Sequence, residues 1–170
     1  ANAGHGHKKV AEVLFEAFKK KGLSEKDLRL EDALDLTPWF FRKAYPAIYY
    51  HSVKYSPQSW GKSYELTDKP SIYRWVKPIR YLGNWLVGQK LLRQVLEDKP
   101  DWIICTHFLS AQLFSQAKLE GKIQSKIMVV ITDYYPHTFW VNPGTDMYWC
   151  MSEECAEDLE QRGVDPKKIQ

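Results

Sequence analysis

Two short segments, one near each end of the chain, combine residue types that suit proton transfer. The first is Gly4-His5-Gly6-His7, where two glycines let the backbone approach a ligand and His7 supplies an imidazole that titrates near neutral pH. The second is the run 132–140, which contains Asp133 and His137. A carboxylate can orient a catalytic histidine or bind a hydroxyl group, and His137 can contact an acceptor or donor phosphates. Together the two segments predict an acid–base site.

Each of these residues also has a purely structural interpretation. His7 can cap a helix on an exposed turn, and Asp133 can form a turn with its own backbone. Trp140 is expected to fill the core. No metal is expected at His5 and His7, because two ligands are too few for a stable site.

The second segment directly follows an apolar run, which predicts a buried parallel strand over residues 127–131. Similar runs predict strands at 102–105 and 147–151, and a short strand is also expected at 27–33. Helical spacing predicts helices from the glycine turn to Gly22, at 83–97, at 109–119, and after the capping residue Ser152. This alternation is typical of an α/β protein with a doubly wound parallel sheet. Ligands bind at the carboxyl ends of such strands, which is where Asp133 and His107 are expected to lie.

The glycine-rich turn at residues 4–7 predicts a β-strand directly before it, at a position upstream of residue 1. A glycine-rich turn that opens a helix normally follows a strand of the sheet, and in a doubly wound fold that strand is central. We therefore expect a further strand upstream of residue 1.

Residues 39–93 concentrate basic and aromatic side chains. The stretch holds ten lysines and arginines against two acidic residues, and more than half of the aromatic residues of the chain. Tryptophan and tyrosine favour the membrane–water interface, and basic side chains are attracted to anionic head groups. We predict a membrane-docking insertion at about residues 38–85, built from short helices because prolines interrupt it. The expected contacts are Trp39, Phe40, Phe41, Arg42, Lys43, Trp60, Trp75, Lys77 and Arg80.

Other uses of these rings are weighed against membrane contact. Many can fill the core, and about half of the seven tryptophans are expected to be buried. The composition also suits single-stranded nucleic acid, but no recognised nucleic-acid module accompanies it, so no nucleic-acid partner is expected.

The chain length and the cysteines indicate the number of domains and the cellular location. A chain of 170 residues suits a single domain. Its three cysteines, Cys105, Cys150 and Cys155, lack metal-ligand spacing, which predicts reduced thiols and a cytoplasmic location. No run approaches the roughly 20 apolar residues of a membrane-spanning helix.

Four segments in register resemble the N-terminal domain of the monogalactosyldiacylglycerol synthase and processive diacylglycerol glucosyltransferase family. These are inverting glycosyltransferases with two Rossmann-like domains, the GT-B type, and are more distantly similar to the N-acetylglucosaminyltransferase that makes lipid II. The segments are Ala3-Gly4-His5-Gly6-His7, Lys99-Pro100-Asp101-Trp102-Ile103-Ile104, 129–140 and 151–169.

The resemblance implies that residues 1–170 form the acceptor-binding domain, without the C-terminal domain that binds the nucleotide sugar. The full enzyme would move glucose or galactose from a UDP-sugar to diacylglycerol, on the inner face of the cell membrane, without a cofactor or a required metal. His7 would be the general base, Asp133 would shape the catalytic site, and Gly4, Gly6, His107 and His137 would contact acceptor or donor. This domain alone is expected to be inactive.

Two other functions remain open. One is a glycosyltransferase for another membrane acceptor, such as a peptidoglycan lipid intermediate. The other is a non-catalytic lipid-binding or regulatory domain that keeps the fold.

Overall fold

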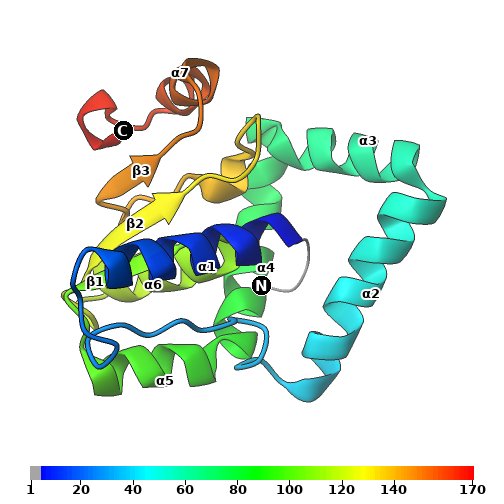
Figure 1. Ribbon diagram of the computed structural model, residues 1–170. Coiled ribbons are helices and arrows are strands. Elements are labelled where there is room, and N and C mark those ends of the chain that lie inside the picture. The colour runs from blue at the N-terminus through cyan, green and yellow to red at the C-terminus, as the bar shows by residue number, and fades with distance from the viewer. Residues whose placement is uncertain (1–4) are drawn as a thin grey trace.

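The protein is an α/β domain built on a small parallel sheet (Figure 1). The computed structural model describes the backbone of residues 5–170 and the side chains of residues 6–170. In that part of the chain three strands lie in the order β1 (Trp102–Cys105), β2 (Lys126–Val130) and β3 (Met147–Trp149). Both neighbouring pairs are parallel, with Ile103 beside Ile127 and Val129 beside Tyr148. The predicted Rossmann-like parallel architecture is confirmed.

The two faces of the sheet are covered to different extents. Helix α6 (Phe108–Leu119) packs against β1 and β2. Alternate strand residues, including Ile103, Cys105, Ile127 and Val129, join a buried core with the apolar side chains of α6. The residues between them point to the opposite face, where α1 (His5–Lys20) lies, and are only partly buried.

Helices α5 (Gln89–Asp98) and α7 (Glu153–Gln161) complete the domain around the sheet. The side chain of Ser152 caps α7 by accepting a hydrogen bond from the Cys155 backbone N–H, as predicted. Gly22 has a positive φ of 93° just after α1, which confirms it as the stop of that helix. None of the helices described here is long and apolar enough to cross a membrane.

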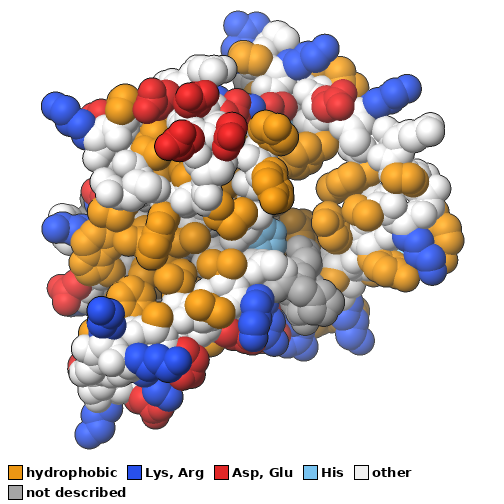
Figure 2. All heavy atoms as spheres, turned by 45° about the horizontal axis from the view of Figure 1, so that its top comes forward, with side chains coloured by type: hydrophobic (Ala, Val, Ile, Leu, Met, Phe, Trp, Pro, Cys, Tyr) orange, Lys and Arg blue, Asp and Glu red, His pale blue; other side chains and the backbone are white. Residues whose placement is uncertain are grey.

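Three consecutive helices form an arm that projects from the sheet: α2 (Trp39–Tyr55), α3 (Pro57–Asp68) and α4 (Pro70–Val87) (Figure 1). None of the three contains a buried residue. Helix α4 packs against α6, while α2 lies farthest from the sheet. Figure 2 shows hydrophobic side chains on both sides of the gap between this helical arm and the rest of the molecule, with a histidine at its base.

Several expectations about this part of the chain are wrong. The arm consists of long helices rather than short ones, because Pro57 and Pro70 occupy first turns and Pro46 and Pro78 are accommodated inside α2 and α4. The helix expected at 83–97 is split at Gly88, where α4 ends and α5 follows.

The strand expected at 27–33 is also absent from the structure, which has turns and irregular backbone there. Burial of the tryptophans was overestimated as well. Trp140 is buried, whereas the other six are exposed: Trp39, Trp60, Trp75, Trp85, Trp102 and Trp149.

Candidate functional site

His7 lies at the carboxyl edge of the parallel sheet, where the sequence predicted a ligand site. Its Nδ1 is 2.6 Å from the Oγ1 of Thr132, the second residue after β2. Its ring meets the ring of His107 edge to face at 4.9 Å, and His107 follows β1. Two strand ends and the first turn of α1 therefore hold the imidazole.

The surroundings of His7 favour its neutral form. Burial lowers the pKa of His7 below its usual 6.5, and this outweighs the charge of Asp133 and the nearby Thr106 carbonyl, which both raise it. A neutral imidazole retains a lone pair that can accept a proton. His7 remains only partly buried, so the ring is accessible to a reactant.

Asp133 lies close enough to His7 to act on it electrostatically, and two other groups fix its carboxylate. The indole Nε1 of Trp140 donates a hydrogen bond to its Oδ2 at 2.7 Å. The Tyr64 hydroxyl, from α3, donates to the same oxygen at 3.4 Å. Burial raises the pKa of Tyr64, and the charge of Asp133 raises it further, so the phenol stays protonated. The core role expected of Trp140 is confirmed by its full burial.

His107 is a support for the site rather than part of its surface. Its side chain is only 3% exposed, and its Nδ1 accepts a hydrogen bond from the Leu109 backbone N–H, which caps α6. Burial holds the pKa of His107 well below 6.5, and a positive charge on nearby His7 would lower it further. The contact of His107 with acceptor or donor stays a prediction.

His137 is likewise buried, at 2% exposure, and its contact with a head group or phosphate stays a prediction. Its Nδ1 accepts from the Phe139 backbone N–H at 3.1 Å, and its Nε2 lies 3.0 Å from the Tyr64 carbonyl. Burial lowers the pKa of His137, although the Asp68 carboxylate opposes this. The neutral ring joins the loop after β2 to helix α3.

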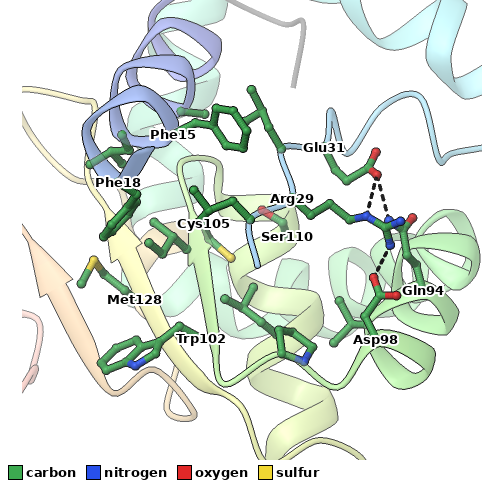
Figure 3. A pocket seen from close by; sticks show the side chains of 18 of the residues that line it. Phe15, Phe18, Arg29, Glu31, Gln94, Asp98, Trp102, Cys105, Ser110 and Met128 are labelled. Carbon is green, nitrogen blue, oxygen red and sulfur yellow. Dashed lines mark hydrogen bonds and ion pairs between the residues drawn. The ribbon is translucent and has the colours of Figure 1, made fainter. Parts of the chain in front are cut away.

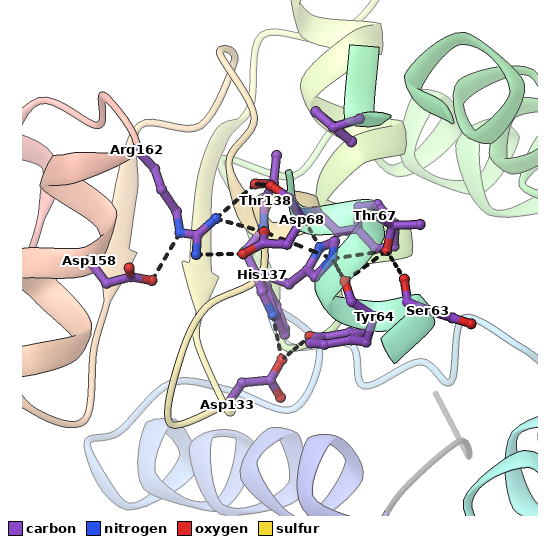
Figure 4. A network of polar contacts seen from close by, with 12 residues as sticks. Ser63, Tyr64, Thr67, Asp68, Asp133, His137, Thr138, Asp158 and Arg162 are labelled. Carbon is purple, nitrogen blue, oxygen red and sulfur yellow. Dashed lines mark hydrogen bonds and ion pairs between the residues drawn. The ribbon is translucent and has the colours of Figure 1, made fainter. Parts of the chain in front are cut away.

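A second polar network extends this link toward α7 (Figure 4). Arg162 donates two hydrogen bonds to Asp68, from Nη1 at 2.7 Å and from Nη2 at 2.8 Å. Arg162 also donates to Asp158 and to the Thr138 hydroxyl. Burial alone would raise the pKa of Asp68, but hydrogen bonds from Arg162 and Thr138 outweigh it and lower the pKa to about 2. This network fastens the helical arm to the carboxyl edge.

The glycines of the opening turn are only partly covered by the structure. Gly4 lies outside the described residues. Gly6 lies in the first turn of α1, and a Cβ there would meet no described atom within 4 Å. Internal packing among the described residues therefore does not require glycine at position 6.

The residues predicted to contact a membrane do not behave alike. Trp39, Phe40 and Trp75 are strongly exposed on the arm, as are Arg42 and Lys43. Phe41 instead stacks on Tyr45 at 5.2 Å, and Trp60 meets Tyr49 edge to face at 5.6 Å.

Lys77 and Arg80, on α4, are only partly exposed. The Arg80 guanidinium lies over the ring of Phe139 at 4.4 Å, and its Nε and Nη1 are buried. Arg80 therefore packs within the domain, and its contact with a membrane stays a prediction. Lys77 lies over the ring of Tyr81 at 5.4 Å.

Sequence reasoning missed two partners of this site. Thr132 had a usable signal, because it is polar and directly follows the apolar run of β2. Tyr64 had none, since it lies 69 residues from Asp133 in the sequence.

The parallel sheet and the helices around it define a Rossmann-like α/β domain, with polar groups at the carboxyl edge of the sheet. The chain belongs to the monogalactosyldiacylglycerol (MGDG) synthase family, whose model matches residues 7–170.

The curated relatives agree with this family. The chain is 25% identical over 182 residues to the processive diacylglycerol beta-glucosyltransferase of Bacillus cereus strain B4264, and 24% identical over 184 residues to that of Bacillus thuringiensis strain Al Hakam. Each match covers 99% of this chain and 42% of the relative, so the chain spans about two-fifths of their length. No solved structure matches the chain significantly.

Proposed function

We propose that this chain is the acceptor-binding domain of an inverting glycosyltransferase that moves glucose or galactose from a UDP-sugar to the hydroxyl group of diacylglycerol. The main support is the position of His7 beside Thr132 and Asp133, at the carboxyl edge of a parallel sheet, in a member of the MGDG synthase family. The relatives are named as diacylglycerol glucosyltransferases, which favours this acceptor.

In the proposed reaction His7 is the general base. When the ring donates through Nδ1 to Thr132, its Nε2 carries the lone pair that removes the acceptor proton. The hydroxyl oxygen attacks the anomeric carbon as the bond to the UDP oxygen breaks, so the configuration inverts. Asp133, fixed by Trp140 and Tyr64, stabilises the positive charge that forms on His7.

The nucleotide sugar is proposed to bind to a second domain of the same enzyme, facing this edge. The proton transfer assigned here uses side chains alone and assigns no role to a metal or a cofactor. Open space beside Gly6 is consistent with the close approach of a reactant to the start of α1.

The helical arm is proposed to dock this domain on an anionic membrane surface. On α4 the exposed apolar residues Trp75, Ile79, Leu82 and Leu86 recur at helical spacing and form one stripe. Trp75 and Ile79 are 71% and 75% exposed. Such a stripe beside Arg74 and Lys77 suits a helix lying in the membrane interface, with its basic residues near the head groups.

We also propose that the enzyme is peripheral on the inner, cytoplasmic face of the cell membrane, where the stripe would attach it to the lipid surface. UDP-sugars are cytoplasmic metabolites and diacylglycerol is dissolved in the bilayer. The reacting groups meet only where a site opens toward both, which is the arrangement proposed here for the gap beside the arm (Figure 2).

Substitution of His7 tests the catalytic assignment. In the full-length enzyme, His7→Ala should reduce transfer from UDP-glucose or UDP-galactose to diacylglycerol by roughly 10²- to 10⁴-fold, the usual contribution of a general base. Sedimentation with anionic vesicles should be unchanged. The matched control is His51→Ala, because His51 is an exposed histidine on α2, away from the sheet edge.

Full activity of the His7→Ala enzyme would exclude the proposed base. Assays with other acceptors test the substrate separately. Transfer to a peptidoglycan lipid intermediate but not to diacylglycerol would retain the mechanism and change the acceptor. Vesicle binding without transfer to any acceptor would favour a regulatory lipid-binding domain.

A further inference from the structure

Helix α3 makes a row of contacts with the loop that follows β2 (Figure 4). The Thr67 Oγ1 lies 3.2 Å from the Nε2 of His137, and the Asp68 carboxylate accepts a hydrogen bond from the Thr138 backbone N–H at 2.7 Å. The ring of Tyr64 meets the ring of His137 at 4.3 Å. Because α3 contains no buried residue, its position depends on these contacts and on its neighbours α2 and α4.

The hydroxyl of Tyr64 makes a separate contact, with the carboxylate of Asp133. It donates to the Oδ2 at 3.4 Å, and the indole of Trp140 donates to the same oxygen at 2.7 Å. Trp140 is fully buried in the core, whereas Tyr64 belongs to the helical arm. Both donors bind Oδ2, so Oδ1 is available for the positive charge that forms on His7 in the proposed reaction. Asp133 is therefore held between the core and the arm.

The hydrogen bond from Tyr64 to Asp133 is longer than such bonds usually are. A hydroxyl normally lies about 2.5–2.7 Å from a carboxylate oxygen to which it donates, and here the distance is 3.4 Å. Catalytic hydrogen bonds are often long in unliganded enzymes and shorten when the reactants bind. A small movement of α3 toward the sheet would shorten this bond and hold the carboxylate more firmly.

The pocket between α1, β1 and α5 does not supply a link between the arm and the site (Figure 3). It has a volume of about 1010 Å³, but none of the described residues that line it belongs to α2, α3 or α4. At its rim Arg29 pairs with Asp98 and Glu31, so these charges satisfy one another. The contact that joins the arm to the Asp133 carboxylate is the Tyr64 hydroxyl.

We propose that Tyr64 is a positioning residue, which holds the Asp133 carboxylate beside His7 and links the position of the helical arm to the rate of transfer. This inference rests on the proposed function, because it uses the general base and the membrane docking assigned there. When α2 and α4 attach to an anionic lipid surface, α3 moves with them, since it packs against both. The bond from Tyr64 to Asp133 then shortens, and the carboxylate is fixed where it stabilises protonated His7. Attachment to lipid therefore raises kcat as well as bringing the enzyme to its acceptor.

The hydroxyl can be removed without releasing the arm. The backbone carbonyl and the ring of Tyr64 contact His137, and Thr67 and Asp68 add their own contacts, so none of these uses the phenol oxygen. Tyr64→Phe therefore removes only the donor to the Asp133 carboxylate. The matched control is Tyr50→Phe, at an exposed tyrosine of α2 in the same arm.

The test measures transfer by the full-length enzyme from UDP-glucose or UDP-galactose to dihexanoylglycerol. This diacylglycerol dissolves in water, so vesicles are not needed to supply the acceptor. Adding vesicles of phosphatidylcholine and phosphatidylserine should raise the kcat of the unmodified enzyme and of Tyr50→Phe severalfold. In the presence of vesicles, Tyr64→Phe should have a kcat roughly tenfold lower with little change in KM, because its carboxylate is misplaced. Its stimulation by vesicles should be lost, while its sedimentation with them is unchanged.

Hydrogen exchange tests the link without any sugar transfer. In the full-length protein, the same vesicles should slow exchange at the backbone amides of residues 133–139, because α3 is held more firmly against this loop. Slowed exchange in a protein that transfers no sugar would support the link between the arm and Asp133 and remove the proposed reaction. Exchange that is unaffected by vesicles would overturn the inference, whether or not transfer occurs.

Two kinetic results would also overturn the inference. If vesicles stimulate Tyr64→Phe as much as the unmodified enzyme, Tyr64 does not link the arm to the site, and the role of His7 as the base is unaffected. If Tyr64→Phe raises the KM for dihexanoylglycerol at an unchanged kcat, Tyr64 binds the acceptor and does not position Asp133.

Discussion

The Nδ1 of His7 lies 2.6 Å from the Oγ1 of Thr132, although 125 residues separate them in the sequence. This contact joins the first turn of α1 to the end of β2 and sets the rotation of the imidazole. A ring that donates through Nδ1 directs its Nε2 away from Thr132. Thr132 therefore has a positioning role in the proposed mechanism, without contacting the reacting atoms itself.

Thr132→Val removes the hydroxyl and keeps the shape of the side chain. In the full-length enzyme we expect kcat to fall by roughly tenfold to a hundredfold with a smaller change in KM, because misplacing a catalytic group costs about that much. Thr132→Ser should restore most of the rate. Nitrogen-15 NMR of the His7 ring should show a changed balance of tautomers in the valine variant only. If the ratio of His7 tautomers is unchanged in Thr132→Val, Thr132 does not position the imidazole, even if the rate of transfer falls.

Protonation of the buried histidines should make stability depend on pH. Burial lowers the pKa of His7, His107 and His137 in the folded protein, whereas the unfolded chain keeps a value of about 6.5. Below about pH 6.5 the unfolded state therefore binds more protons, and the free energy of unfolding falls as the pH decreases. Above about pH 7 both states are neutral at these positions and this dependence disappears.

Urea unfolding between pH 5 and pH 8 measures this dependence. His107→Asn should flatten it, because asparagine can still cap α6 but does not titrate. His51→Ala, at an exposed position, serves as the control variant. An unaltered slope in His107→Asn would mean that His107 is not held neutral by burial.

The Asp68–Arg162 pair should contribute more to stability than a surface ion pair. Both side chains are largely shielded, and the guanidinium binds the carboxylate with two hydrogen bonds. We expect Arg162→Lys to lower the free energy of unfolding by about 1–3 kcal/mol, because lysine cannot make the paired contact.

Arg29→Lys provides the comparison for this pair. Arg29 and Asp98 are both more than two-fifths exposed, so the change should cost less than about 1 kcal/mol. Urea unfolding measures both losses. Equal losses of free energy of unfolding in the two variants would show that the Asp68–Arg162 pair stabilises the fold no more than a surface ion pair does.

The apolar stripe of α4 should dominate membrane attachment. In the full-length protein, Ile79→Ser combined with Leu82→Ser should weaken sedimentation with vesicles containing anionic lipid by roughly tenfold or more, because two large apolar side chains are lost from the interface. Leu119→Ser is the matched control, since Leu119 is an exposed leucine at the end of α6. Equal weakening in the control would mean that α4 is not the docking face.

Local patterns predicted the sheet and its edge, but they could not predict side-chain partners. The apolar runs at 102–105 and 127–131 identified β1 and β2, because buried parallel strands need such runs. The alternating run 27–33 looked like a strand for a different reason. In the structure Leu28 is only half-buried and Leu30 is exposed, so the alternation of residue types corresponds neither to one-sided burial nor to strand pairing.

The roles of the histidines depended on contacts that no local pattern shows. His137 and His107 both follow strands of the sheet, so the sequence placed them in a cleft. The structure turns His137 toward Tyr64 and buries His107 beneath His7. Tyr64 and His7, the respective partners, lie far from these histidines in the sequence. Tertiary packing of this kind decides the direction of a side chain on a loop, and a local sequence pattern does not contain it.

The clamp between Asp68 and Arg162 also constrains the order of events during synthesis. Helices α2, α3 and α4 have no buried residue of their own, and Asp68 must wait 94 residues for its partner. A nascent chain that has emerged only as far as α5 therefore contains α2, α3 and α4 with their exposed apolar side chains, but not yet Arg162. The ion pair that joins α3 to the end of α7 can form only after residue 162 has been synthesised.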